Sequence, residues 1–237
     1  MAERLEDATA AVLAGGLGTR LRSRIADRPK VLALVQGRPY LSYLLEQVAG
    51  AGIRSVVLLT GYLADQVRST FGENYAGMRL TYSEEPSPLG TAGALRRALP
   101  DLSSPTILLL NGDSYCAASL PAFWEFHQRH EADFSLVLTP VVDSSRYGRV
   151  QVDSGGRVLR FEEKCQAGGT GWINAGIYLM HRALIQEIPA DVPASLERDL
   201  CPRWAAEKRC FGFPCQGRFL DIGTPELYAQ AEAFFTC

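Results

Sequence analysis

The sequence predicts an α/β fold with a Rossmann-like, doubly wound mixed sheet, followed by a strand-rich part. Three observations support this fold class. Short apolar runs alternate with segments of helical periodicity up to about residue 120, several of these runs are apolar on both faces, and the chain beyond is rich in strand-like segments. The length of 237 residues favours a single domain over 1–237, with halves at about 1–120 and about 121–237.

The first half is expected to alternate between strands and helices. A helix over 40–51 is the clearest element, because Leu41, Leu44 and Val48 recur on one helical face. The runs over 56–59 and 107–110 are continuously apolar, which is typical of parallel strands that helices cover on both sides. The expected strands are 9–13, 55–59, 78–82 and 106–110, and the expected helices are 40–51, 63–71 and 91–99.

The second half is expected to consist mainly of strands. Glycine pairs at 155–156 and 168–169 are turn signals between some of them. A capping pattern that starts at Ser195 predicts a helix to about Glu207, and Thr224 followed by Pro225 predicts the last helix. The expected strands are 134–141, 149–153, 157–162 and 172–180.

The composition excludes several classes of function. Lysine and arginine number 24 and aspartate and glutamate 26, so the net charge of −2 gives nonspecific nucleic-acid binding no electrostatic support. No apolar run approaches the roughly 20 residues of a membrane helix, and the charged N-terminus does not resemble a signal peptide. We therefore expect a cytoplasmic protein with a small-molecule ligand and no membrane or nucleic-acid partner; a homo-oligomer is compatible with the sequence. The six irregularly spaced cysteines are expected to be thiols.

A glycine-rich loop follows the first expected strand. At the carboxyl end of a parallel strand, such a loop lets backbone N–H groups approach a phosphate closely. A dinucleotide-binding fingerprint needs a third glycine where Leu21 stands, and a P-loop needs Gly-Lys-Ser/Thr, so both patterns fail. A purely structural tight turn stays open. The residues expected to contact a nucleotide are Leu13, Ala14, Gly15, Gly16, Gly18 and Thr19.

Basic residues crowd the segment that follows this loop. Several of them are expected to be solvated surface charges. A triphosphate with a departing pyrophosphate needs fixed cations where negative charge builds up. We expect Arg20 and Lys30 to provide them.

Two aspartates are expected to hold Mg²⁺, which prefers a few carboxylates together with phosphate oxygens. Asp113 closes the sequence Asn111-Gly112-Asp113 after a central strand, at the same sheet edge as the glycine-rich loop. Asp221 follows a second short apolar run. Either aspartate alone would be a turn former or helix cap as often as not. Two such aspartates beside a phosphate-binding loop are a more specific indication of a metal site.

Two polar residues stand out in the second half. Lys164 follows two glutamates and is either part of a surface ion pair or the group that neutralises an incoming phosphate. Asn174 lies in an apolar strand and needs a partner, which is either structural or a sugar hydroxyl.

Together these motifs resemble the sugar-1-phosphate nucleotidyltransferases, or nucleoside-diphosphate-sugar pyrophosphorylases, over nearly the whole chain. Residues 18–20 and 195–199 most resemble the bacterial D-glycero-D-manno-heptose 1-phosphate guanylyltransferases, with mannose-1-phosphate guanylyltransferases close behind. The motifs are L-A-G-G-x-G-T-R (13–20), P-K (29–30), P-L-G-T-A-G-A (88–94), N-G-D (111–113), E-E-K (162–164), N-A-G-I-Y (174–178) and D-I-G-T-P-E (221–226).

The resemblance implies a glycosyltransferase-A-like nucleotidyltransferase fold, in which the first half binds the nucleotide and the second half the sugar phosphate. It also implies a Mg²⁺-dependent reaction, in which a sugar 1-phosphate oxygen attacks the α-phosphorus of an NTP and pyrophosphate leaves. Arg20 and Lys30 would then hold the triphosphate, and Asp113 and Asp221 the metal. The residues implied for the sugar phosphate are Gly148, Glu163, Lys164 and Asn174, and those implied for the nucleotide also include Pro88, Gly90, Thr91, Asn111 and Gly112.

The resemblance also puts residues 83–90 against the nucleobase. Glu85, or less favourably Glu84, would select guanine, because a carboxylate accepts the two hydrogen bonds that N1–H and the 2-amino group donate. Two exposed loop acids remain the alternative. We therefore expect GTP as the donor and D-glycero-D-manno-heptose 1-phosphate as the acceptor. Mannose 1-phosphate, another base or sugar, and a catalytically silent regulatory protein that binds a nucleotide sugar stay open.

Overall fold

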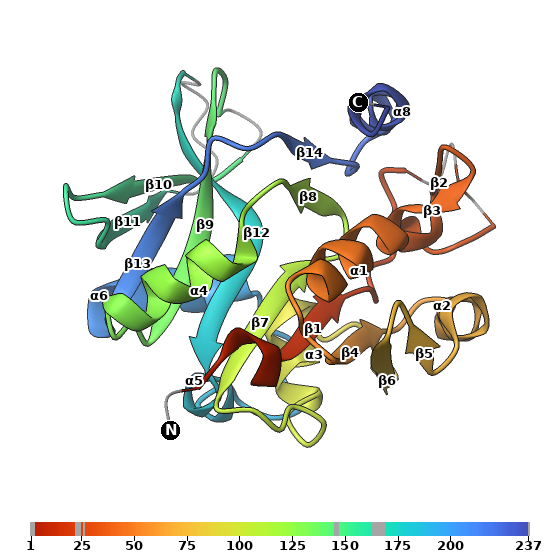
Figure 1. The fold of residues 1–237 in the computed structure, drawn as a ribbon, viewed down its shortest axis with the longest axis horizontal. Helices are drawn as coiled ribbons and strands as arrows, with labels where there is room; N and C mark the ends of the chain where they lie inside the picture. The colour runs from red at the N-terminus through yellow and green to blue at the C-terminus, as the bar shows by residue number, and fades with distance from the viewer. Residues whose placement is uncertain (1–2, 22–24, 26, 145–146, 163–168, 237) are drawn as a thin grey trace.

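A ten-stranded sheet runs through both halves of the chain (Figure 1). The computed structural model describes residues 3–21, 25, 27–144, 147–162 and 169–236. Strand β1 (Thr9–Leu13) lies parallel to β4 (Ser55–Thr60) on one side and to β7 (Thr106–Asn111) on the other. Beyond β4 come β6 (Met78–Glu84), which is parallel to it, and the short antiparallel strand β5 (Asn74–Tyr75).

The other side of the sheet contains antiparallel pairs, so the sheet is mixed. Strand β12 (Gly171–His181) lies antiparallel to both β7 and β9 (Phe134–Val141). Strand β13 (Cys210–Pro214) is parallel to β9, and β10 (Arg149–Val152) pairs with β12 and with β11 (Val158–Glu162). The predicted doubly wound mixed sheet with a strand-rich second part is therefore confirmed.

Helices cover both faces of the parallel strands. Helix α1 (Tyr40–Gly50) shares a buried cluster with Val12, while α3 (Gly90–Arg97) shares the opposite cluster with Ala11. Successive strand residues point to opposite faces, so continuously apolar strands serve both clusters. The other helices are α2 (Ala64–Phe71), α4 (Leu120–Arg129), α5 (Arg182–Gln186), α6 (Cys201–Glu207), α7 (Pro225–Tyr228) and α8 (Ala231–Phe234), with 3-10 turns η1 (Leu5–Asp7) and η2 (Lys30–Leu32) and a π-helical turn η3 (Leu196–Leu200).

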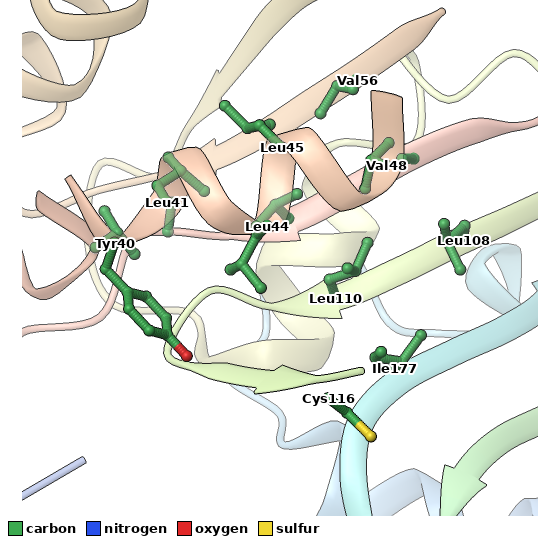
Figure 2. Close-up of a cluster of buried hydrophobic side chains, with 14 of the residues drawn as sticks. Tyr40, Leu41, Leu44, Leu45, Val48, Val56, Leu108, Leu110, Cys116 and Ile177 are labelled. Atoms are coloured by element: carbon green, nitrogen blue, oxygen red, sulfur yellow. The ribbon is translucent and has the colours of Figure 1, made fainter. Parts of the chain in front are cut away.

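The apolar face of α1 lies against the sheet, as its periodicity predicts. Figure 2 shows Leu44 and Val48 on the side of the helix that faces Leu108 and Leu110 of β7. Leu44 is 1% exposed, and burial of a side chain of this size stabilises the fold by about 1.5–3 kcal/mol. Burial on this scale holds the strand ends, and the loops that follow them, in place.

Helix boundaries differ from the predictions where backbone geometry intervenes. Helix α2 begins at Ala64, because Leu63 has a left-handed φ of 55° and serves as the N-cap residue. The helix expected from Ser195 to Glu207 is divided into η3 and α6. Pro202 lies at this junction, where a proline cannot donate a helical hydrogen bond. The last predicted helix is also two short pieces, α7 and α8.

Two small sheets were not predicted. Strand β8 (Ser114–Cys116) pairs with β14 (Phe219–Asp221), and β2 (Leu34–Val35) pairs with β3 (Arg38–Pro39). Strands of two or three residues are too short to show a hydrophobic period. The β8–β14 pair brings Asp221 close to Asp113, the residue directly before β8, and so places the two aspartates predicted for the metal side by side.

Candidate active site

A cavity of about 730 Å³ opens at the carboxyl ends of the central strands. Elements from both halves of the chain line it, as expected for a ligand crevice in an open α/β sheet. Its wall includes six of the residues that the sequence predicted for nucleotide, metal or sugar phosphate, namely Arg20, Asn111, Asp113, Gly148, Asn174 and Asp221.

Lys30 and Asp113 form an ion pair beside this cavity. Lys30 Nζ lies 2.7 Å from Asp113 Oδ2, and the Lys30 side chain is 10% exposed while that of Asp113 is 42% exposed. Lys30 begins η2, next to the left-handed Gly18 of the glycine-rich loop. The loop, the lysine and the aspartate therefore occupy one corner of the sheet edge, although 83 residues separate the ion-pair partners.

Asp221 joins this pair through the small β8–β14 sheet. Asp221 is opposite Ser114 in that sheet, and the N–H of Ile222 donates to the Asp113 carbonyl over 2.9 Å. Burial raises the pKa of the Asp221 carboxyl, and the Asp113 charge raises it further, while Lys30 and the Gly223 N–H act in the opposite direction. The two carboxylates are therefore close enough to repel each other.

This arrangement fits a divalent cation. A cation between Asp113 and Asp221 would relieve the repulsion that raises the pKa of Asp221. Over the described parts of the chain there is no group of three or more His, Cys, Asp and Glu side chains suited to a metal. Mg²⁺ needs no such protein cage, because it keeps waters and takes substrate phosphate oxygens beside one or two carboxylates.

Several predicted nucleotide residues lie around a second, smaller cavity of about 250 Å³. Gly15, Glu85 and Pro88 line it. A β-carbon on Gly15 would come within 2.9 Å of Glu85 Oε1, so the glycine lets the loop approach the carboxylate closely. The segment 85–88 and the glycine-rich loop thus meet here, as the resemblance implies for a base-binding region.

Glu85 has a structural contact that the sequence did not indicate. Its Oε2 accepts a hydrogen bond from the Leu89 N–H over 2.8 Å. Burial raises the pKa of this carboxyl, and the hydrogen bond from Leu89 opposes that rise. One carboxylate oxygen is thus used to shape the loop. Recognition of guanine by Glu85 stays a prediction.

Comparison with known proteins identifies the family. The sequence profile described as nucleotidyl transferase matches residues 9–236. The chain belongs to the nucleotidyl transferase family. The resemblance inferred from the motifs is therefore confirmed.

Individual relatives of this nucleotidyl transferase share about a third of its residues. It is 34% identical to D-glycero-alpha-D-manno-heptose 1-phosphate guanylyltransferase of Aneurinibacillus thermoaerophilus, over 94% of this chain and 96% of that one. It is 36% identical to mannose-1-phosphate guanylyltransferase of Mycobacterium tuberculosis, over 94% of this chain but 63% of that one. The crystal structure of HddC from Yersinia pseudotuberculosis complexed with GMP-PN has a TM-score of 0.85 and 31% identity, covering 97% of this chain and 100% of that chain.

Some predicted residues of the nucleotidyl transferase have mainly structural contacts. A β-carbon on Gly112 would lie 2.1 Å from the Leu13 carbonyl oxygen, so this position requires glycine. Ala14 donates its N–H to Leu59, and the Thr91 hydroxyl donates to Glu197 over 2.8 Å. Glu163 and Lys164 lie outside the described residues, so their predicted roles stay predictions.

Several cavity residues were missed by the sequence analysis. Ser195 was interpreted as a helix cap, and it is one, because its hydroxyl accepts from the Arg198 N–H. Glu197 belongs to the segment 195–199 that carries the family resemblance, but an acid fits the first turn of any helix, so its type and position did not show that its side chain enters the cavity. The residues of the cavity wall that were missed are Tyr147, Phe161, Glu162, Ser195, Glu197, Arg198 and Pro202.

Two further predictions concern membrane-spanning helices and the state of the cysteines. Within the described ranges, no helix combines the length and apolar character needed to cross a lipid bilayer. The four described cysteines, Cys116, Cys201, Cys210 and Cys215, are buried free thiols, as predicted. Cys165 and Cys237 lie outside the described residues.

Proposed function

We propose that the protein transfers a guanylyl group from GTP to a sugar 1-phosphate, giving a GDP-sugar and pyrophosphate. The observation that carries this proposal is the convergence of Lys30, Asp113 and Asp221 beside a cavity that Arg20 also lines. Nucleotidyl transfer needs fixed positive charge at the triphosphate and a metal-binding carboxylate pair close by. These residues supply both.

In the proposed reaction, a phosphate oxygen of the sugar 1-phosphate attacks the α-phosphorus, and the bond to the pyrophosphate oxygen breaks. Arg20 and Lys30 bind the triphosphate and stabilise the charge that moves to the leaving pyrophosphate. Asp113 and Asp221 would hold Mg²⁺, which would supply positive charge to neutralise the phosphates. Lys164 binds the phosphate of the acceptor, and Asn174 and Gly148 line the pocket for its sugar. The family resemblance supports all of these roles, and the shared cavity supports those of Arg20, Asp113, Gly148, Asn174 and Asp221.

Two lines of support favour GTP as the donor. Glu85 retains an oxygen that is free of the Leu89 hydrogen bond, and a carboxylate oxygen accepts from the N–H donors of guanine. The relatives named above are guanylyltransferases, and the ligand GMP-PN is by name a guanine nucleotide.

D-glycero-D-manno-heptose 1-phosphate is the proposed acceptor. The Aneurinibacillus relative, named for this substrate, is matched over nearly its whole length. Mannose 1-phosphate is the second candidate, because the Mycobacterium relative is 36% identical to this chain. A cytoplasmic location and a homo-oligomeric assembly stay predictions.

The test is pyrophosphate release by the purified protein across four NTPs and a panel of sugar 1-phosphates, with Mg²⁺ and with EDTA. We expect the strongest release with GTP and heptose 1-phosphate, and loss of release with EDTA. Release with mannose 1-phosphate instead would correct the acceptor, and release with another NTP would correct the base. No release with any pair would contradict the proposal and favour the silent nucleotide-sugar binder.

A further inference from the structure

The Glu197 carboxylate lies at the centre of a partly buried hydrogen-bond network. Thr91 Oγ1 donates to Glu197 Oε2 over 2.8 Å, Ser195 Oγ donates to the same oxygen over 3.2 Å, and the Tyr178 hydroxyl donates to Oε1 over 3.1 Å. A carboxylate only accepts hydrogen bonds, so each hydroxyl turns its hydrogen toward Glu197. Three elements distant in the sequence, α3, β12 and η3 with its cap, thus meet at one side chain.

The orientation of the Tyr178 hydroxyl in turn determines the orientation of the Asn174 side-chain amide. Because the Tyr178 hydrogen points to Glu197, its oxygen accepts from Asn174 Nδ2 over 2.7 Å. On the other side of the amide, the Gly176 N–H donates to Asn174 Oδ1 over 2.9 Å. A backbone N–H can only donate, so both contacts require the same orientation of the amide. Among the residues that the structure describes, the second Nδ2 hydrogen of Asn174 has no partner, and it is therefore available to a ligand.

A bulge in β12 produces these contacts. Asn174 is opposite Leu138 of β9, but Tyr178 is opposite Leu136, so four residues of β12 span two of its neighbour. Gly176 within the bulge has a φ of 77°, and a β-carbon there would lie 2.6 Å from the Ser114 hydroxyl. Burial raises the pKa of Tyr178 well above its usual range, so the hydroxyl keeps its proton. Asn174 itself lies in the cavity wall.

Through Thr91, the Glu197 carboxylate also contacts the segment that is predicted to bind the nucleotide. The Thr91 oxygen that donates to Glu197 accepts from the Leu196 N–H over 2.7 Å. Two backbone hydrogen bonds add to this attachment, from Ala194 N–H to the Leu89 carbonyl and from Ala92 N–H to the Ala194 carbonyl. The segment predicted to bind the nucleotide is therefore fastened to the turn that carries Glu197.

We propose that Glu197 is a positioning residue: through Tyr178 it orients the Asn174 amide in the sugar pocket, and through Thr91 it fixes the segment over 88–91. Glu197 lines the cavity, but both of its oxygens already accept hydrogen bonds from the protein, so it acts through these neighbours. The inference rests on the proposed function, since it assigns Asn174 to the sugar.

Glu197→Gln tests the direction of the network. The new side chain has nearly the same shape but carries one NH₂ group, which cannot accept a hydrogen bond. If that group faces Tyr178, the tyrosine hydroxyl loses the acceptor that fixes its hydrogen, and the hydrogen can turn toward Asn174. The Asn174 amide would then lose its match with the Gly176 N–H. If it faces the other way, the Thr91 and Ser195 hydroxyls lose their acceptor.

The kinetic experiment compares Glu197→Gln, Tyr178→Phe and the double variant with wild type. We expect Tyr178→Phe to raise KM for the sugar 1-phosphate about tenfold and to leave KM for GTP within about twofold, because a misdirected amide loses one polar contact. The double variant should bind the sugar phosphate no more weakly than Glu197→Gln, because the two residues act in series. Tyr43→Phe is the matched control. It removes a hydroxyl bonded to the Val35 carbonyl at a site away from the cavity wall.

Wild-type KM for the sugar 1-phosphate in Tyr178→Phe, or additive losses in the double variant, would overturn the inference. A thermal melt checks that each variant folds. If Glu197→Gln does not fold, the milder substitution Tyr178→Phe still tests the inference.

A second measurement does not depend on turnover. The side-chain amide signal of Asn174 in a ¹⁵N-labelled sample, assigned by its disappearance in Asn174→Ala, should shift in Glu197→Gln and in Tyr178→Phe but not in Tyr43→Phe. An unshifted signal would overturn the inference. If wild type releases no pyrophosphate with any substrate pair, the proposed function fails, and this signal still decides whether the network orients Asn174.

Discussion

Gly112 joins the two loops that meet at the carboxyl edge of the sheet, and a single methyl group there should disable the site. Its N–H donates to the Leu13 carbonyl over 3.0 Å, and a β-carbon on Gly112 would lie 2.1 Å from that oxygen. Real β-carbons essentially never come closer than 3.0 Å to such an atom, so in Gly112→Ala the β-carbon and the Leu13 carbonyl oxygen must separate by at least 0.9 Å, and we expect the ends of β1 and β7 to shift as a result.

This displacement separates the predicted phosphate loop from the predicted metal residue. The loop with Arg20 follows Leu13, while Asp113 follows Gly112 directly. A misplacement of about 1 Å between reacting groups can lower turnover about 100-fold. We therefore expect kcat for pyrophosphate release to fall by about that factor in Gly112→Ala. The lost hydrogen bond should lower the free energy of unfolding by about 1 kcal/mol.

The assay measures pyrophosphate release at saturating substrates, together with urea unfolding. Gly50→Ala is the matched control, because a β-carbon at this position in α1 meets no atom within 4 Å. We expect its turnover to equal that of wild type. Wild-type turnover in Gly112→Ala would refute the reasoning, because it would mean that the sheet edge absorbs the displacement without disturbing the site.

The remaining predictions concern the metal residues, the base and a buried histidine. Asp113→Asn and Asp221→Asn should each lower kcat about 100-fold or more with the thermal melt preserved, because each removes a carboxylate that would hold Mg²⁺; wild-type turnover in either variant would exclude that role. Glu85→Gln should weaken the preference for GTP over ATP and UTP in competition assays, whereas an unchanged preference would assign base recognition to the loop backbone. Burial lowers the pKa of His127 from 6.5 to about 4, so between these two pH values the histidine is protonated in the unfolded chain but neutral in the folded protein. The free energy of unfolding should therefore fall by up to about 3 kcal/mol between pH 6.5 and pH 4. Urea titrations should show a shallower pH dependence in His127→Gln, and an identical dependence would contradict this assignment.

The fold class and the main strands could be predicted because their signals are local. The spacing of Leu41, Leu44 and Val48 identifies α1, and the continuous apolar runs over 56–59 in β4 and 107–110 in β7 identify strands buried on both faces. The motifs that follow these strands could be placed at one edge of the sheet, because parallel strands end on the same side. Arg20 and Asp113 could therefore be predicted as parts of one site, whereas Asn174, which lies within the antiparallel strand β12, was assigned to it only through the family resemblance.

The sequence by itself thus determined the family, the main strands of the sheet and about half of the polar residues in the cavity wall, since these depend on periodicity and on motifs read in order. Only the tertiary structure decided the partners of those residues. The β8–β14 pair, which unites Asp113 with Asp221, is too short to have a period, and the bulge that turns Asn174 toward Tyr178 depends on register with β9. The hydrogen bonds of Glu85 to Leu89 and of Glu197 to Thr91 depend on distances that no linear pattern contains. A side chain's chemistry can be read along the chain, but its partner is set by packing of segments that are distant in sequence.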